Sequence, residues 1–134
     1  MIRKITIAIL ITITTIVVSG CAPKLYDAET LHQKGAYLTK ITRKVKVAIR
    51  KDIEDDKLKI YIQNKYQNDM KEFSDYSIII KNQNGTAVVL MCDKEKTKAL
   101  LEDLSCTGSL EGGYLFKENL PCDFHLDIAE ECKR

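Results

Sequence analysis

The residues of this sequence best suited to chemistry are its cysteines and histidines. Four cysteines lie in the last third of the chain, at Cys92, Cys106, Cys122 and Cys132. A structural zinc site normally takes close pairs such as C-x₂-C, and these spacings contain none. The sequence order also allows a cysteine nucleophile activated by His125, with Cys122 or Cys132 as its partner. The alternative is that the four cysteines form disulfides, and the choice depends on whether the chain is exported.

Catalytic motifs are not found in the rest of the sequence. Neither H-E-x-x-H nor G-x-S-x-G occurs, and the glycines of residues 108–113 lack the Lys-Ser/Thr of a phosphate loop. His32 and His125 are expected at the surface. Carboxylates form short runs that are typical of solvated turns rather than of an acid–base pair: Glu54-Asp55-Asp56, Glu102-Asp103 and Glu130-Glu131. The sequence therefore predicts a protein that is not an enzyme and holds no metal or cofactor.

The first twenty residues have the layout of an export signal. Arg3 and Lys4 form a positive start, residues 5–18 are uncharged, and Ser19 and Gly20 are small. About 14 residues span roughly 21 Å as a helix, which is short of the ~30 Å hydrocarbon core of a bilayer. A cleaved signal is therefore favoured over a membrane-spanning anchor.

The end of this segment, Val18-Ser19-Gly20-Cys21, resembles a lipobox, the motif of bacterial lipoproteins. The resemblance covers residues 1–21, and Val18 stands where leucine is usual. It implies cleavage before Cys21 and a lipid on Cys21 that holds the protein at a membrane. Ala22 rather than an aspartate follows, which by the same resemblance implies the outer membrane, facing the periplasm, in a host with two membranes. The alternative is an ordinary signal peptide with a chance cysteine.

Removal of the signal changes the charge balance of the chain. The sequence holds 21 basic and 19 acidic residues, and Arg3 and Lys4 account for the surplus. A neutral mature chain argues against nucleic-acid binding, which needs cations to neutralise phosphates. The charges are uneven, however, because residues 34–51 contain seven basic residues and no acidic one. This stretch is suited to anionic headgroups or an acidic partner, or is simply a solvated face.

Hydrophobic periodicity predicts two helices followed by strands. Apolar residues at three- and four-residue steps from about residue 29 indicate a first helix, which stops at the polar stretch 51–56. A second helix is predicted over residues 56–69, antiparallel to the first because the connection is short. Runs at 76–81 and 87–91 then read as strands. Asn84-Gly85 lies between them and is a strong hairpin signal.

The C-terminal part of the chain has a weaker pattern. Residues 98–104 fit a helix or a strand, and a strand is favoured because a third meander strand suits the short spacing. A loop is predicted over 105–118 and a last short strand over 122–127. The predicted fold class is α+β, with two N-terminal helices followed by a small antiparallel β-meander stapled by disulfides. The predicted division is a signal peptide at 1–20, a lipidated tether at 21–28 and a single domain at 29–134.

Assigning Cys21 to lipid leaves an even number of cysteines in an exported chain, which predicts two disulfides. In the predicted meander, Cys92 and Cys106 lie at opposite ends of a strand about 26 Å long, so a disulfide between them is disfavoured. A fourth strand antiparallel to the third would start near Cys106 and end near Cys92. This arrangement predicts the pairs Cys106–Cys122 and Cys92–Cys132, of which the first closes the glycine-containing loop.

The function favoured by these observations is that of a membrane-anchored envelope lipoprotein with a non-enzymatic structural or protein-interaction role. The alternative is a binding module for a soluble or cell-wall ligand. The glycine-containing loop between Cys106 and Cys122 is the candidate site for that alternative. No family resemblance covers residues 22–134.

Overall fold

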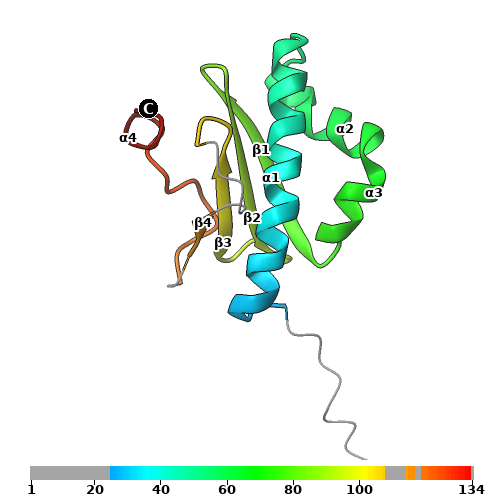
Figure 1. Cartoon of the computed structure of the whole chain (residues 1–134). Coiled ribbons are helices and arrows are strands. Elements are labelled where there is room, and N and C mark those ends of the chain that lie inside the picture. The colour runs from blue at the N-terminus through cyan, green and yellow to red at the C-terminus, as the bar shows by residue number, and fades with distance from the viewer. Residues whose placement is uncertain (1–24, 108–113, 117–118, 134) are drawn as a thin grey trace, which may run out of the picture.

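The computed structural model describes residues 25–107, 114–116 and 119–133 (Figure 1). Helices come first and an antiparallel sheet follows, which confirms the predicted α+β class. The elements are α1 (Ala28–Arg50), α2 (Asp55–Lys65), α3 (Gln67–Met70), the 3-10 helix η1 (Lys71–Phe73), β1 (Tyr76–Gln83), β2 (Thr86–Asp93), β3 (Ala99–Leu104), β4 (Tyr114–Leu115) and α4 (Ile128–Glu131). Within these ranges, no helix has the length and apolar character needed to cross a bilayer.

Helix α1 is the longest element and confirms the first predicted helix. Its buried apolar residues recur at three- and four-residue steps, so they form one side of the helix: Leu31, Leu38, Ile41, Val45 and Ala48. This side packs against β2 and β3. Burial of each large aliphatic side chain in the row contributes about 1.5–3 kcal/mol. The helix stops at Lys51, and Asp52 then adopts a positive φ of 61° that turns the chain.

The second predicted helix is divided in two. Helix α2 buries Leu58 and Ile62 in the core and ends at Tyr66, whose φ of −123° and ψ of 48° are not helical. Helix α3 follows directly and lies with α2 beside α1 (Figure 1). At the start of α2, the Asp55 carboxylate accepts the backbone N–H of Asn82 at 2.6 Å. Helix α2 therefore satisfies part of the free edge of β1, which would otherwise be open to pairing.

The sheet is a meander in the order β1-β2-β3-β4. Asn84 and Gly85 form its first turn with φ angles of 52° and 85°, which confirms the predicted hairpin. Strand β3 pairs antiparallel with β2, so residues 99–104 are a strand, as favoured. All six residues of β3 are buried. Burial on both faces of the sheet therefore outweighs the helix propensity of this segment.

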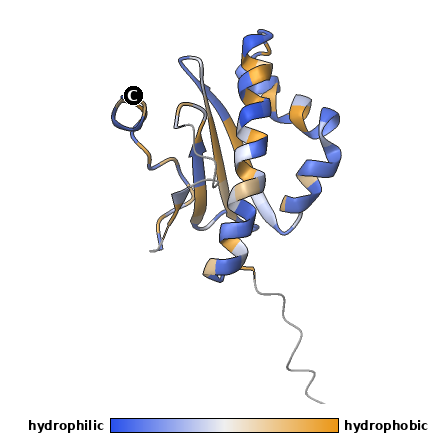
Figure 2. Ribbon diagram, viewed as in Figure 1, coloured by the Kyte–Doolittle hydropathy of each residue, from blue (hydrophilic) through white to orange (hydrophobic). Residues whose placement is uncertain are grey.

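Both faces of the sheet carry apolar clusters. The larger cluster fills the space between the sheet and helices α1 and α2, and Ile78, Val89 and Leu101 are among its members. The smaller cluster lies around Leu90, Cys92 and Ala99, and residues near the C terminus cover it. Because both faces are covered, β2 and the first half of β3 are mostly apolar, and Figure 2 shows orange ribbon in the middle of the sheet.

The last strand lies earlier in the chain than predicted. Strand β4 falls inside the predicted 105–118 loop and pairs with β3, placing Leu115 opposite Leu101. Residues 122–127 form no strand, so that prediction is wrong. Phe124 nevertheless packs on the smaller apolar cluster. The alternating pattern there marks a segment that covers the sheet rather than one that pairs with it.

The domain also begins earlier than the predicted boundary at residue 29. The Tyr76 hydroxyl donates a hydrogen bond to the Leu25 carbonyl at 2.7 Å. The ring of Tyr26 meets the ring of Tyr76 edge-on, with 6.4 Å between centroids. Leu25 also packs against the larger cluster. Residues 25–28 thus belong to the domain, and only residues 22–24 separate it from Cys21.

Candidate functional site

Cys92, Cys106, Cys122 and Cys132 form two disulfides, as predicted, but the predicted pairing is wrong. Cys92 is joined to Cys122 with 5.7 Å between Cα atoms, and Cys106 is joined to Cys132 with 5.5 Å. The predicted pairs Cys106–Cys122 and Cys92–Cys132 do not occur. The disfavoured pair Cys92–Cys106 does not form either, because β3 separates these residues.

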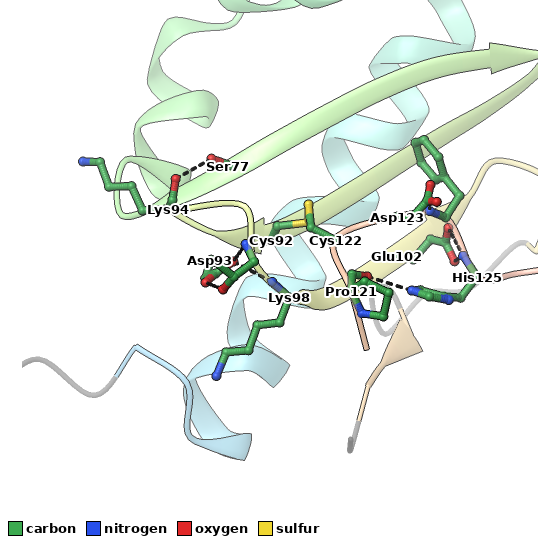
Figure 3. The surroundings of a disulfide bond; sticks show 12 residues. Ser77, Cys92, Asp93, Lys94, Lys98, Glu102, Pro121, Cys122, Asp123 and His125 are labelled. Carbon is green, nitrogen blue, oxygen red and sulfur yellow. Dashed lines mark hydrogen bonds between the residues drawn. A yellow bond between two sulfur atoms is a disulfide. The ribbon is translucent and has the colours of Figure 1, made fainter. Parts of the chain in front are cut away.

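The observed pairing follows from the position of the fourth strand. Strand β4 and the residues after it run back along β3, where the Ala99 N–H donates to the Leu120 carbonyl at 2.9 Å. This path brings Cys122 to Cys92 at the end of β2 (Figure 3). The chain then reverses and carries Cys132 back to Cys106. The prediction failed because it placed the returning strand after Cys122 instead of before it.

Residues 119–132, here called the C-terminal strap, are held to β3 by Glu102 as well as by the disulfides. The Glu102 side chain is fully buried, and its carboxylate accepts the backbone N–H of Leu126 at 2.7 Å and that of His125 at 3.1 Å (Figure 3). Burial raises the pKa of Glu102, and the two backbone hydrogen bonds oppose that rise. Glu102 therefore fixes the middle of the strap, between its two disulfide-bonded ends.

Asp103 points to the opposite face of β3, toward α1. It is 2% exposed, and burial raises its pKa, against the lowering influence of the Thr42 hydroxyl, the Leu104 N–H, the Thr39 hydroxyl and Arg43. The Leu104 N–H donates to the carboxylate at 3.0 Å. The Thr39 hydroxyl lies close to it but has no well-formed hydrogen bond among the described residues. These side chains line a cavity of about 30 Å³, the space of one water molecule.

The prediction that Glu102 and Asp103 are solvated is wrong. Successive residues of a strand point to opposite faces, and both faces of β3 are covered. The available signal in the sequence was the apolar context, because Ala99, Leu100 and Leu101 precede the pair and Leu104 follows it. Since the two carboxylates lie on opposite sides of the sheet, they cannot act together on one substrate.

The other predicted site residues are dispersed. Cys21 and residues 108–113 lie outside the described residues, so lipidation and the glycine-loop site stay predictions. His32 and His125 are exposed, as expected. Cys122 and Cys132 are both in disulfides, so neither offers the free thiolate that a Cys–His nucleophile needs. In the part of the chain that the structure describes, no group of three His, Cys, Asp or Glu residues is placed to hold a metal.

The basic stretch of α1 is partly neutralised within the fold. The Lys34 ammonium lies 3.3 Å from the Glu72 carboxylate, and Lys44 forms an ion pair with Asp69. Lys46 donates to the carbonyl of Gly85 in the hairpin turn. One side of α1 is buried against the sheet, and these three lysines already bind groups within the fold. The whole basic surface of α1 therefore cannot contact a membrane at once.

Two open hollows lie on the helical side of the molecule. The first, of about 430 Å³, is at the α1–α2 turn and is largely apolar, with Ile53, Ile60 and Tyr61 in its lining. The second, of about 420 Å³, is largely polar and is lined by consecutive residues at the junction of α2 and α3: Asn64, Lys65, Tyr66, Gln67, Asn68 and Asp69. Both have the size of small-ligand sites, which are typically about 300–1,000 Å³.

Comparisons of the chain with protein-family models, with curated proteins and with solved structures found no significant match. The function is therefore inferred from the residues of this chain. Three features carry that inference: the lipobox-like sequence ending at Cys21, the disulfide-held domain, and the polar hollow between α2 and α3.

Proposed function

We propose that this chain is the precursor of a lipid-anchored protein of the bacterial cell envelope. The observation that carries the proposal is the lipobox-like sequence Val18-Ser19-Gly20-Cys21 behind a basic start and an uncharged run. The two disulfides support it, because disulfides persist in the oxidising compartments that exported proteins reach. Several acyl chains on one cysteine would give stable anchoring, since each buried CH₂ contributes about 0.8 kcal/mol.

A lipid on Cys21 would hold the domain close to the bilayer. The four residues from Cys21 to Lys24 extend at most about 14 Å before the packed residue Leu25. The N-terminal end of α1, next to Leu25, would then face the membrane. With its 23 residues, α1 is about 34 Å long, so the α1–α2 turn would be carried away from the surface. The flank formed by α2 and α3 would remain accessible.

We propose a role in binding rather than in catalysis. The buried carboxylates Glu102 and Asp103 lie on opposite faces of β3 and serve the packing of the strap and of α1. Ala22 after Cys21 supports a place on the outer membrane, facing the periplasm, if the host has two membranes. A protein partner in the envelope is the leading form of this role. A soluble or cell-wall ligand is the second, and the polar hollow between α2 and α3 favours it.

Metabolic labelling with a clickable fatty acid tests the anchor. We expect the wild-type chain to incorporate the label and to sediment with membranes, and Cys21→Ser to lose both properties. Ser19→Ala is the matched control, because it keeps a small residue before the cleavage site and should remain labelled. Labelling of Cys21→Ser, or no labelling of the wild type in its bacterial host, would overturn the proposal.

Cross-linking in intact envelopes tests the binding role. We expect a reproducible protein adduct with the wild-type chain, lost when the α2–α3 flank is altered. Recovery of the chain alone under conditions that cross-link known envelope complexes would count against a protein partner and leave the ligand-binding form.

A further inference from the structure

Helix α1 lies beside α2 and α3 (Figure 1), and lysine and tyrosine side chains of these elements contact one another there. Residues of α1 at three- and four-residue steps share one flank of the helix, and the end of α2 supplies the neighbouring side chains. We call this surface the lysine–tyrosine face, and it consists of Tyr37, Lys40, Lys44, Tyr61, Lys65 and Tyr66.

Cation–π contacts occur in two groups on the lysine–tyrosine face: Lys40 with Tyr37 on α1, and Lys44 and Lys65 with the tyrosines at the end of α2. The Lys40 ammonium lies 5.2 Å from the centre of the Tyr37 ring, and that of Lys44 lies 4.5 Å from the Tyr66 ring. Lys65 lies 5.7 Å from the Tyr66 ring. These contacts hold aromatic rings and ammonium groups side by side at the surface. Each contributes only about 0.5–1 kcal/mol when exposed, so the cations remain available to a ligand.

The lysine–tyrosine face has a surplus of positive charge in a mature chain that is neutral as a whole. Lys44 is paired with Asp69, whereas Lys40 and Lys65 have no ion-pair partner among the described residues. Lys65 donates a hydrogen bond to the Tyr61 hydroxyl at 3.1 Å. This bond, with the charge of nearby Lys51, lowers the pKa of Tyr61.

The polar hollow of about 420 Å³ opens on this face. Lys65, Tyr66 and Asp69 belong to its lining and also to the network of contacts just described. The other lining residues are Asn64, Gln67 and Asn68, whose side-chain amides each carry both donors and an acceptor. Figure 2 shows α3 as mostly hydrophilic ribbon. The hollow thus combines amide-bearing residues, an aromatic residue, the cation of Lys65 and the carboxylate of Asp69, which Lys44 neutralises.

We infer that the hollow and the lysine–tyrosine face bind a linear anionic saccharide of the uronic-acid class. Amides pair with sugar hydroxyls, tyrosine rings pack against the apolar faces of sugar rings, and ammonium groups pair with carboxylates. On α1 the face runs from Tyr37 to Lys44, about 10 Å along the helix, and it continues onto the end of α2 and into the hollow, which suits a chain of sugars rather than a single small anion. The site does not depend on a lipid at Cys21.

Titration calorimetry of the full chain in detergent with tetragalacturonate tests the inference. We expect saturable binding that weakens as salt is raised, because the charges are exposed. Lys40→Gln and Lys65→Gln should each weaken binding about tenfold, the loss expected for one charge-assisted hydrogen bond. Asn68→Ala should weaken binding by a few fold. The neutral tetrasaccharide maltotetraose should not bind.

Lys81→Gln is the matched control, because Lys81 is an exposed lysine on β1 that belongs neither to the lining of the hollow nor to the lysine–tyrosine face. It removes the same charge and should leave binding unchanged. Equal weakening by Lys81→Gln, equal binding of maltotetraose, or no binding of tetragalacturonate would overturn the site. Binding of phosphatidylglycerol vesicles that is lost in Lys40→Gln and Lys65→Gln, without saccharide binding, would replace the saccharide by a lipid surface. Failure of lipid labelling at Cys21 would leave this site unaffected.

Discussion

Removing the two disulfides one at a time separates the effect of chain entropy from that of burial. The pairs Cys92–Cys122 and Cys106–Cys132 span 30 and 26 positions. In the chain-entropy model these loops are worth about 3.6 and about 3.5 kcal/mol of unfolding free energy at 25 °C. Entropy alone therefore predicts nearly equal losses for Cys92→Ala/Cys122→Ala and Cys106→Ala/Cys132→Ala.

Burial makes the two losses unequal. Cys92 is fully buried beside Leu90 and Ala99, whereas Cys106 is exposed. Replacing a buried sulfur by hydrogen leaves a space the size of about one CH₂, which costs roughly 1 kcal/mol more. We therefore expect a loss of about 4.5 kcal/mol for Cys92→Ala/Cys122→Ala and about 3.5 kcal/mol for Cys106→Ala/Cys132→Ala.

Urea unfolding followed by circular dichroism measures both losses, provided that the m-value is used to check how far each unfolded chain expands. Losses of this size are a large share of the 5–15 kcal/mol typical of a domain. A larger loss for Cys106→Ala/Cys132→Ala would refute the argument from burial. Non-reducing peptide mapping that joined Cys92 to Cys132 would refute the pairing itself.

Three further predictions concern single side chains. Burial raises the pKa of Asp103 in the folded state, so folding favours the protonated carboxyl. The resulting stabilisation is complete below the unfolded-state pKa and is lost as pH rises through the folded-state pKa. Urea unfolding at about pH 3 and at about pH 7 should therefore show Asp103→Asn gaining stability relative to the wild type at the higher pH. The gain should be about 1.4 kcal/mol for each unit by which the folded-state pKa is raised. The same difference in unfolding free energy between variant and wild type at both pH values would contradict this. Gly85→Ala should cost about 1 kcal/mol in thermal unfolding, because φ is 85° and no atom lies within 4 Å of the added Cβ, so that the cost is backbone strain alone. Tyr76→Phe should lose about 1 kcal/mol with the hydrogen bond to Leu25 and should speed amide hydrogen exchange in the first turn of α1; unchanged exchange there would show that the bond does not hold this end.

Features of the fold that depend on neighbouring residues were predictable from the sequence. The period of apolar residues defined α1, because a helix that packs on a sheet needs one apolar side. Asn84-Gly85 defined the hairpin, because both residues readily take positive φ. The break at Tyr66 that divides α2 from α3 has no such signal in the sequence.

Features that depend on distant contacts were not predictable in the same way. The disulfide pairing depends on which segment returns along β3, and β4 is only Tyr114–Leu115, too short for a periodic pattern. The burial of Glu102 depends on the strap that covers it. The lysine–tyrosine face likewise brings together α1 and the end of α2, so its basic residues were visible in sequence but the arrangement was not.

The most direct test of the proposed anchor is mass spectrometry of the N-terminal peptide from protein recovered in its bacterial envelope. We predict a peptide that begins at Cys21 and carries the added mass of diacylglycerol on the cysteine sulfur. A mature chain that begins elsewhere, or one that begins at an unmodified Cys21, would contradict the lipid anchor.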